Sequence, residues 1–250
     1  MKQVIITPAM GKRLIGRGLA AHPAVRTVLK KGTIVIVAGT TNGYVAEEIL
    51  TSLGQGGDFS RKGFRRGMVV PPDFDPKEAK ADFDGDVILV DGAWQKGKTI
   101  FDVADALQAG DMILKGANAL DVRRGHAAVY IGDPQGGTAA AAGRAVIGRR
   151  VQLIIPVGLE KRVLGNVMDL AAELNAPTAE GPRLLTLPGQ AFTELDAIAM
   201  LTGVGARLLA GGGIYGAEGC VWVGITGQDE QVAAAEELIR SVAHEPPCKA

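Results

Sequence analysis

The stretch IVIVAGTTNGYVAEEIL, residues Ile34–Leu50, decides the expected fold. Its first four residues are β-branched and apolar, which is typical of a strand buried on both faces of a parallel sheet. Apolar residues then recur at helical spacing within Val45–Leu50. A buried strand that passes directly into a helix is the repeating unit of α/β proteins. The joint between them, Gly39–Gly43, is therefore the first place to look for a ligand site.

Short apolar strands and amphipathic helices alternate along most of the remaining chain. We expect strands at Val4–Ile6, Val87–Val90, Met112–Leu114, Ala127–Ile131 and Val151–Ile155, and helices after Pro8 and at Phe101–Leu107, Thr138–Ile147 and Val163–Leu174. This alternation predicts right-handed crossovers and an α/β fold with a Rossmann-like, mostly parallel sheet that carries helices on both faces.

The pattern is interrupted at Asn175–Pro182, where two prolines and a glycine predict a domain boundary. We expect residues 1–180 to form the Rossmann-like ligand-binding domain and residues 181–250 to form a small ferredoxin-like α+β unit. The second unit should contain strands at Leu184–Leu187, Ala206–Ala210 and Cys220–Ile225 and helices at Glu194–Leu201 and Glu230–Val242. Thr193 with Asp196, and Thr226 with Asp229, fit helix-start boxes.

Composition restricts the partners and the compartment. The 250 residues include 27 basic and 27 acidic side chains, so the net charge is zero and nucleic acid is not an expected partner. No apolar segment approaches the length of a membrane span, and Cys220 and Cys248 have no metal-ligand spacing, so we expect a cytoplasmic protein without a membrane partner. The high apolar content favours a homo-oligomer. No metal ion or cofactor is predicted.

The joint after the first long strand contains Gly39, Thr40, Thr41, Asn42 and Gly43. Backbone N–H groups at such a helix start point toward one spot, and the helix dipole favours an anion there. The hydroxyl and amide side chains add further donors. The alternative is an ordinary turn, in which Asn42 caps the helix and the glycines adopt positive φ angles.

A second candidate site begins where the strand Met112–Leu114 ends. Lys115 follows this strand directly, and Gly116 and Asn118 open the next turn. Ligands of open α/β sheets gather at the carboxyl ends of the strands. A lysine buried there can anchor an anion or transfer a proton, whereas a surface lysine would only be solvated.

A third joint carries Gly136, Gly137 and Thr138 ahead of an alanine-rich helix. This helix start could also seat a phosphate or carboxylate, although a tight turn before a buried helix explains the same residues. Lys161 follows the strand Val151–Ile155 and is expected to add positive charge at the same edge.

The segment GAWQKGKT, Gly92–Thr99, matches the phosphate-binding loop pattern G-x-x-x-x-G-K-[ST]. In that interpretation Lys98 neutralises phosphates, Thr99 holds magnesium and Asp133 is a further metal ligand. Against it, Trp94 is bulky where the backbone should wrap a phosphate. The alternative is a polar, hairpin-like turn with solvated lysines.

Three loops, Gly39–Gly43, Asp91–Ala93 and Lys115–Leu120, follow one another in chain order, each after an apolar strand. Together with the later segment Glu160–Gly165 they resemble the ribose 5-phosphate isomerase family, whose wider superfamily includes glucosamine-phosphate deaminases and coenzyme A transferases. The resemblance implies a sugar-phosphate pocket in which Asp91 accepts a hydroxyl hydrogen bond or acts as base, and in which Gly92 lies in a binding loop.

The glutamate that the isomerases use for proton abstraction is missing, since Arg123, Arg124 and Gly125 stand in its place. We therefore expect the chain to bind a small anionic metabolite, such as a sugar phosphate, at the strand ends. Asp91 and Lys115 are the candidate catalytic residues. An isomerase-type or transferase-type enzyme and a non-catalytic metabolite sensor both remain possible, and a nucleotide-binding protein using Gly92–Thr99 is a third alternative.

Overall fold

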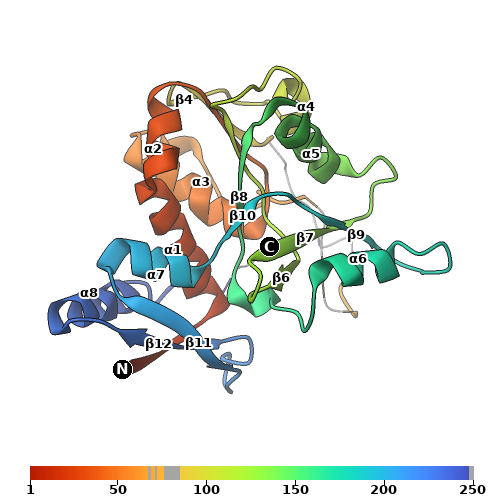
Figure 1. Ribbon diagram of the computed structural model, residues 1–250. Coiled ribbons are helices and arrows are strands. Elements are labelled where there is room, and N and C mark those ends of the chain that lie inside the picture. The colour runs from red at the N-terminus through yellow and green to blue at the C-terminus, as the bar shows by residue number, and fades with distance from the viewer. Residues whose placement is uncertain (67–68, 71, 76–84, 248–250) are drawn as a thin grey trace.

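The computed structural model describes residues 1–66, 69–70, 72–75 and 85–247, so Cys248 lies outside the described residues. The chain forms an α/β fold with three sheets (Figure 1). The strands are β1 Lys2–Ile6, β2 Thr33–Ile36, β3 Val87–Val90, β4 Ala93–Trp94, β5 Met112–Leu114, β6 Ala119–Asp121, β7 His126–Ile131, β8 Gln152–Pro156, β9 Arg183–Thr186, β10 Gln190–Phe192, β11 Gly205–Gly211 and β12 Val221–Thr226. The α-helices are α1 Pro8–Ala21, α2 Pro23–Lys30, α3 Thr40–Ser52, α4 Ile100–Val103, α5 Gly137–Arg149, α6 Val167–Leu174, α7 Glu194–Thr202 and α8 Asp229–Arg240, and the 3-10 helices are η1 Gly56–Asp58 and η3 Leu159–Lys161.

The largest sheet has six strands in the order β10-β8-β5-β2-β3-β4. The first four strands are mutually parallel, which confirms the α/β prediction. In Figure 1, α1, α2 and α3 lie on one side of this sheet and α4 and α5 on the other. Its central strands are buried on both faces, as Val35 and Ile113 show with no exposed surface. The carboxyl ends of β2, β5, β8 and β10 therefore share one edge.

Strand β3 runs antiparallel to β2, with Thr33 opposite Val90 and Ile36 opposite Val87. This pairing is an exception within the mostly parallel sheet that the sequence predicts. A short antiparallel strand needs no helical crossover. As a result, the amino end of β3, and not its carboxyl end, lies at the edge where β2 and β5 end.

Strand pairing crosses the predicted domain boundary in both directions. β1 pairs antiparallel with β12, whose other neighbour is β11. β9, expected in the C-terminal unit, pairs with β7 in a sheet of order β6-β7-β9, and β10 joins β8 in the main sheet. The choice of strand partner is non-local, so the chain segments do not follow the predicted division at Asn175–Pro182.

Helix α1 packs between α3 and α7, and its glycines permit the close approach. A Cβ added at Gly16 would lie 2.8 Å from the carbonyl oxygen of Tyr44, and one added at Gly18 would lie 2.8 Å from Cβ of Ala197. Any larger side chain would force these helices apart. The fold around the main sheet therefore depends on small residues in α1.

Two of the three predicted helix-start signals are confirmed, and α6 begins at Val167 instead of the expected Val163. Thr7 caps α1 by accepting a hydrogen bond from Met10 N, and Thr193 with Asp196 forms the expected box at α7. The box expected at Thr226 is wrong, because Gln228 is the cap of α8. In the part of the chain that the structure describes, no helix is long and apolar enough to cross a membrane.

Candidate functional site

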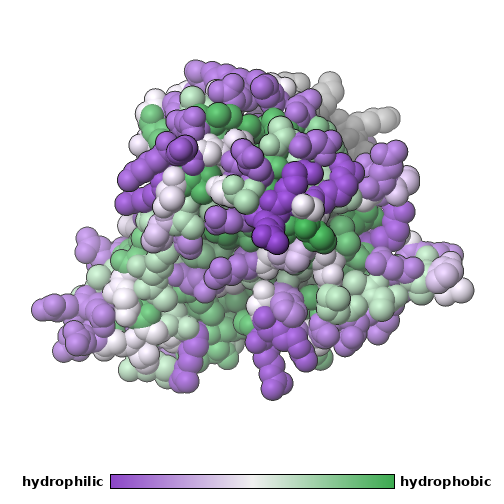
Figure 2. Space-filling view, turned by 45° about the horizontal axis from the view of Figure 1, so that its top comes forward, coloured by the Kyte–Doolittle hydropathy of each residue, from purple (hydrophilic) through white to green (hydrophobic). Residues whose placement is uncertain are grey.

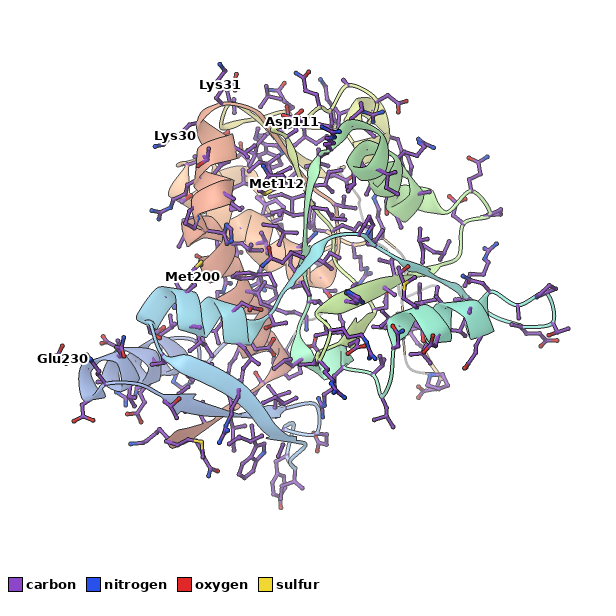
Figure 3. The ribbon with its side chains drawn as sticks, viewed as in Figure 1. Lys30, Lys31, Asp111, Met112, Met200 and Glu230 are labelled. Carbon is purple, nitrogen blue, oxygen red and sulfur yellow. The ribbon has the colours of Figure 1, made fainter. Side chains whose placement is uncertain are left out.

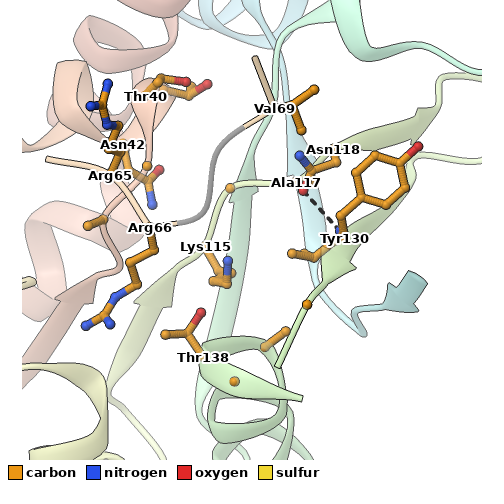
Figure 4. A pocket seen from close by; sticks show the side chains of 18 of the residues that line it. Thr40, Asn42, Arg65, Arg66, Val69, Lys115, Ala117, Asn118, Tyr130 and Thr138 are labelled. Atoms are coloured by element: carbon orange, nitrogen blue, oxygen red, sulfur yellow. Dashed lines mark hydrogen bonds between the residues drawn. The ribbon is translucent and has the colours of Figure 1, made fainter. Parts of the chain in front are cut away.

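A cavity of about 810 Å³ opens where the carboxyl ends of β2 and β5 meet the amino ends of α3 and α5. Figure 4 shows Lys115 in its middle, with Asn42, Arg65 and Arg66 on one side and Asn118 and Tyr130 on the other. Most of the candidate ligand-binding residues line this cavity, namely Gly39, Thr40, Thr41, Asn42, Lys115, Gly116, Asn118, Gly136, Gly137, Thr138 and Lys161. Two strand-to-helix joints and the loop between β5 and β6 therefore contribute to one site.

Helix α3 begins at this cavity without a side-chain cap. Gly39 is the cap residue, and the first helical bond runs from Gly43 N to the carbonyl oxygen of Gly39 at 2.8 Å. The N–H groups of Thr40, Thr41 and Asn42 precede that bond, and the first turn contains no acidic residue. Uncapped N–H groups at the positive end of a helix dipole form an anion site. Gly43 does not line the cavity; a Cβ there would contact the Arg61 side chain at 3.4 Å.

Asn42 has a structural role that its candidate assignment did not include. Its side-chain Nδ2 donates to the carbonyl oxygens of Val37 and Leu114, at 2.7 and 2.9 Å. These two bonds tie the end of β2 to the end of β5. The carbonyl oxygen of the Asn42 side chain is buried, with no hydrogen-bond partner among the described residues. Asn42 therefore fixes the ends of β2 and β5 relative to each other beside the cavity. The alternative in which Asn42 caps α3 is wrong.

Helix α5 also starts at the cavity without a side-chain cap. Gly136 is the cap residue and has a φ of 78°. Its carbonyl oxygen accepts the first helical hydrogen bond, from Ala140 N at 3.1 Å. A Cβ at Gly136 would lie 2.8 Å from Cβ of Ala140, so a larger residue would displace the first turn. The N–H groups of Gly137 and Thr138 thus form a second donor set facing the same cavity.

Lys115 follows β5 and is 8% exposed. Its amine makes no hydrogen bond or ion pair with any residue that the structure describes. Burial is the main cause that lowers the pKa of Lys115 to about 8, and the positive charges of Lys161 and Arg66 lower it further, while Asp86 opposes them. A buried, unpaired ammonium is costly for a folded protein. The cavity therefore contains a cationic group that an anion would stabilise.

The loop after Lys115 is held from two neighbouring elements. Lys161 Nζ, from η3, donates to the carbonyl oxygen of Ala117 at 2.8 Å. The side-chain oxygen of Asn118 accepts from Tyr130 N of β7 at 3.1 Å (Figure 4). Burial lowers the pKa of Lys161 as well, and Glu160 opposes that change. These contacts fix the positions of Lys115 and Asn118 relative to both helix starts.

Three arginines that were not among the candidates also line the cavity: Arg61, Arg65 and Arg66. They come from the glycine-rich basic stretch after α3, whose clustered charges were the available signal in the sequence. Arg61 lies over the ring of Tyr44, with its Cζ 3.9 Å from the ring centroid. Among the described residues that line the cavity, these three arginines, Lys115 and Lys161 are cationic, and Asp133 is the one carboxylate. The cavity is therefore strongly cationic, although the chain as a whole is neutral.

Asp86, at the amino end of β3, is a further residue that sequence analysis missed. Its side chain has no exposed surface and pairs with Arg66 at 3.0 Å. It also accepts from Ala38 N at 2.9 Å and from Ile100 N at 2.7 Å. Asp86 thus connects the end of β2, the start of α4 and an arginine of the site. The antiparallel direction of β3 brings it to this edge.

The same reversal removes Asp91 and Gly92 from the site. The carboxylate of Asp91 accepts from Gly32 N at 2.8 Å, and Gly32 precedes β2. Asp91 and Gly92 thus lie at the opposite edge of the sheet, where Figure 3 labels Asp111 and Met112 at the start of β5. The placement of Asp91 beside Lys115 is wrong, because the isomerase-like loop order does not reveal strand direction. Hydrophilic side chains cover much of this edge in Figure 2.

The segment Gly92–Thr99 contains the second strand of a hairpin. Ala93 and Trp94 pair antiparallel with β3, and Gln95 N donates to Ile88 at 2.8 Å. Lys98 is exposed, and Thr99 is engaged with Asp102 at the start of the four-residue helix α4. Backbone groups at Ala93–Gln95 and the carbonyl oxygen of Lys98 are therefore already bonded, and the following helix is a single turn. Its geometry matches the hairpin alternative and does not resemble a phosphate-binding loop.

Comparisons with protein-family models, with curated proteins and with solved structures find no match for this chain. Within the described ranges, no group of three or more His, Cys, Asp or Glu residues is arranged to hold a metal ion. The described part of the site contains two uncapped helix starts, buried amines and guanidinium groups. Such an arrangement can bind a compact anion and can present a neutral amine to a bound molecule.

Proposed function

We propose that this chain binds a small phosphorylated or carboxylated metabolite in the cavity, with the anionic group at the start of α3 next to Lys115. The observation that carries the proposal is the buried amine of Lys115, which lacks a partner among the described residues and lies between two uncapped helix starts. Charge-assisted hydrogen bonds to such an anion are the strongest that a site of this kind can make.

Asp91 lies at the opposite edge of the sheet from the cavity, and this placement decides which function is best supported. Isomerisation of a sugar phosphate needs a base beside the substrate, and the expected glutamate is absent from the sequence. Asp91 accepts a bond at the start of β2, on the far edge. We therefore propose ligand binding, and the isomerase reaction is not part of the proposed function.

We also propose that the six-stranded sheet is Rossmann-like and that β1, β11, β12, α7 and α8 form a small ferredoxin-like unit.

Thermal unfolding with glucose 6-phosphate, glucose, inorganic phosphate, and ATP with magnesium tests this proposal, since a ligand of the native state raises the unfolding temperature. We expect glucose 6-phosphate and inorganic phosphate to raise it and glucose to have no effect. Each variant is compared with its own ligand-free midpoint. Lys115→Met should weaken binding roughly tenfold or more, because one charged hydrogen bond is worth about 1.5–3 kcal/mol.

Lys98→Met is the matched control, since Lys98 is an exposed lysine of the hairpin segment and is not among the described residues that line the cavity. It should respond to phosphate as the unmodified chain does. A phosphate response that persists unchanged in Lys115→Met would contradict the proposed site. A response to ATP with magnesium alone, abolished in Lys98→Met, would assign binding to Gly92–Thr99 instead.

A further inference from the structure

The surroundings of Lys115 favour direct contact between its amine nitrogen and a bound molecule, in addition to electrostatic attraction. A lysine that only attracts an anion works best fully protonated, but burial at 8% exposure opposes the charged form. Lys161 is also partly buried, but its amine is hydrogen-bonded, because it donates to the carbonyl oxygen of Ala117 at 2.8 Å. The Lys115 amine has no such bond in the described part of the chain, yet it lines an open cavity. A bound molecule can therefore reach the nitrogen directly.

The charges around Lys115 come from several elements. Arg66 in the loop after α3 and Lys161 in η3 are positive, while Asp86 at the start of β3 is negative and already paired with Arg66. Asp133, after β7, is the lining carboxylate. The pKa of about 8 leaves roughly a quarter of the amine neutral at pH 7.5, against about one part in a thousand at the ordinary value of 10.5. Desolvated lysines next to other cations are nucleophiles for carbonyl compounds.

We propose that the amine of Lys115 forms an imine with the carbonyl carbon of a phosphorylated aldehyde or ketone bound in this cavity. This inference rests on the proposed function, because the phosphate must first be seated at the helix starts. The nitrogen lone pair attacks the carbonyl carbon and a carbinolamine forms. Its hydroxyl then leaves as water, which takes both amine protons, and a carbon–nitrogen double bond remains. The step needs no oxidant or reductant.

Two separate sets of N–H donors allow the phosphate and the carbonyl group of one molecule to bind at different places in the cavity. The N–H groups of Thr40 and Thr41 can hold the phosphate, while those of Gly137 and Thr138 face the same cavity from α5. In Figure 4 Lys115 lies in the middle of the cavity, with Arg66 on one side and Asn118 on the other. An aldehyde or ketone a few bonds from its phosphate therefore fits between the helix starts and the amine.

Reductive trapping tests the imine. The full chain is incubated at pH 7.5 with glyceraldehyde 3-phosphate and sodium cyanoborohydride, which reduces imines to stable amines, and the modified lysines are identified by peptide mass spectrometry. We expect labelling of Lys115 to be at least about tenfold faster than labelling of the exposed Lys98, because the larger neutral fraction outweighs the lower nucleophilicity of a weaker base. Inorganic phosphate should slow it, and glyceraldehyde without phosphate should label Lys115 more slowly.

Lys115→Arg keeps a positive charge but forms no stable imine under these conditions, so it should lose the rapid adduct. The thermal response of the unmodified chain to phosphate tests the binding function separately. If the unmodified chain responds to phosphate but labels Lys115 no faster than Lys98, the imine is refuted and the binding function stands. If neither the thermal response nor the rapid adduct is seen, both proposals fail.

Discussion

Replacing Lys115 by methionine should make the folded protein more stable at neutral pH. Methionine has a similar length and no charge, so it fills the same space without the cost of burying an ammonium. The pKa of Lys115 falls from 10.5 to about 8, mainly through burial. Since each pH unit corresponds to about 1.4 kcal/mol, the charged amine destabilises the native state by about 3 kcal/mol below pH 8.

The sign of the pH dependence follows from proton binding. Between pH 8 and 10.5 the unfolded chain holds a proton on Lys115 that the native state has released. The stability of the unmodified protein therefore rises across this window, and the Lys115→Met variant lacks that rise. The difference between the two proteins should be about 3 kcal/mol at pH 7 and should disappear near pH 10.5.

Urea unfolding at pH 7 and at several values up to pH 10.5 measures this difference directly. With a slope of about 3 kcal/mol per molar urea, the midpoint of the variant should be about 1 M higher at pH 7. Lys98→Met, at an exposed position, should shift stability by less than about 0.5 kcal/mol. A Lys115→Met protein that is equally or less stable at pH 7, or a difference that does not depend on pH, would refute the reasoning.

Three further changes test other parts of the account. Burial, and secondarily the negative charge of Glu160, raises the pKa of Glu194 to about 7. As the pH rises from 4.5 to 7, the unfolded chain loses this proton first, so the free energy of unfolding should fall by up to about 3 kcal/mol. Glu194→Gln should remove this fall in urea titrations at several pH values. An unchanged slope would be evidence against it. Asp86→Ala leaves Ala38 N and Ile100 N without their acceptor and should cost about 3–5 kcal/mol in chemical unfolding, so a loss below about 1 kcal/mol would contradict its assigned role. Thr193→Ala removes the capping box of α7 and should lower the free energy of unfolding by about 1 kcal/mol in the same assay. An unchanged free energy of unfolding would mean that the capping box does not stabilise the fold.

Local features of this fold could be read from the sequence because their causes are local. The β-branched run at Ile34–Val37 became β2, and the Thr7-Pro8 pair began α1, since side-chain shape and a missing N–H act within a few residues. The glycine and hydroxyl joints at Gly39–Gly43 and Gly136–Thr138 became uncapped helix starts for the same reason.

The direction and partners of the strands depended on the rest of the molecule. Nothing within Val87–Val90 tells whether it runs parallel or antiparallel to β2, yet this choice exchanged Asp91 for Asp86 at the site. β1 lies more than 200 residues before its partner β12, and no local pattern records that pairing. Likewise, the stretch around Arg61 and Arg66 lacked periodicity, so its place over the cavity followed only from tertiary packing.

The most direct test of the central claim is the titration of the Lys115 amine, observed by NMR of isotopically labelled lysine side chains with and without inorganic phosphate. We predict that the pKa of Lys115 lies near 8 in the free protein, and that phosphate raises it because an anion beside the amine stabilises the charged form. The signal of Lys98 should not respond to phosphate. A Lys115 amine that titrates near 10.5 and does not respond to phosphate would contradict the anion site at this edge of the sheet.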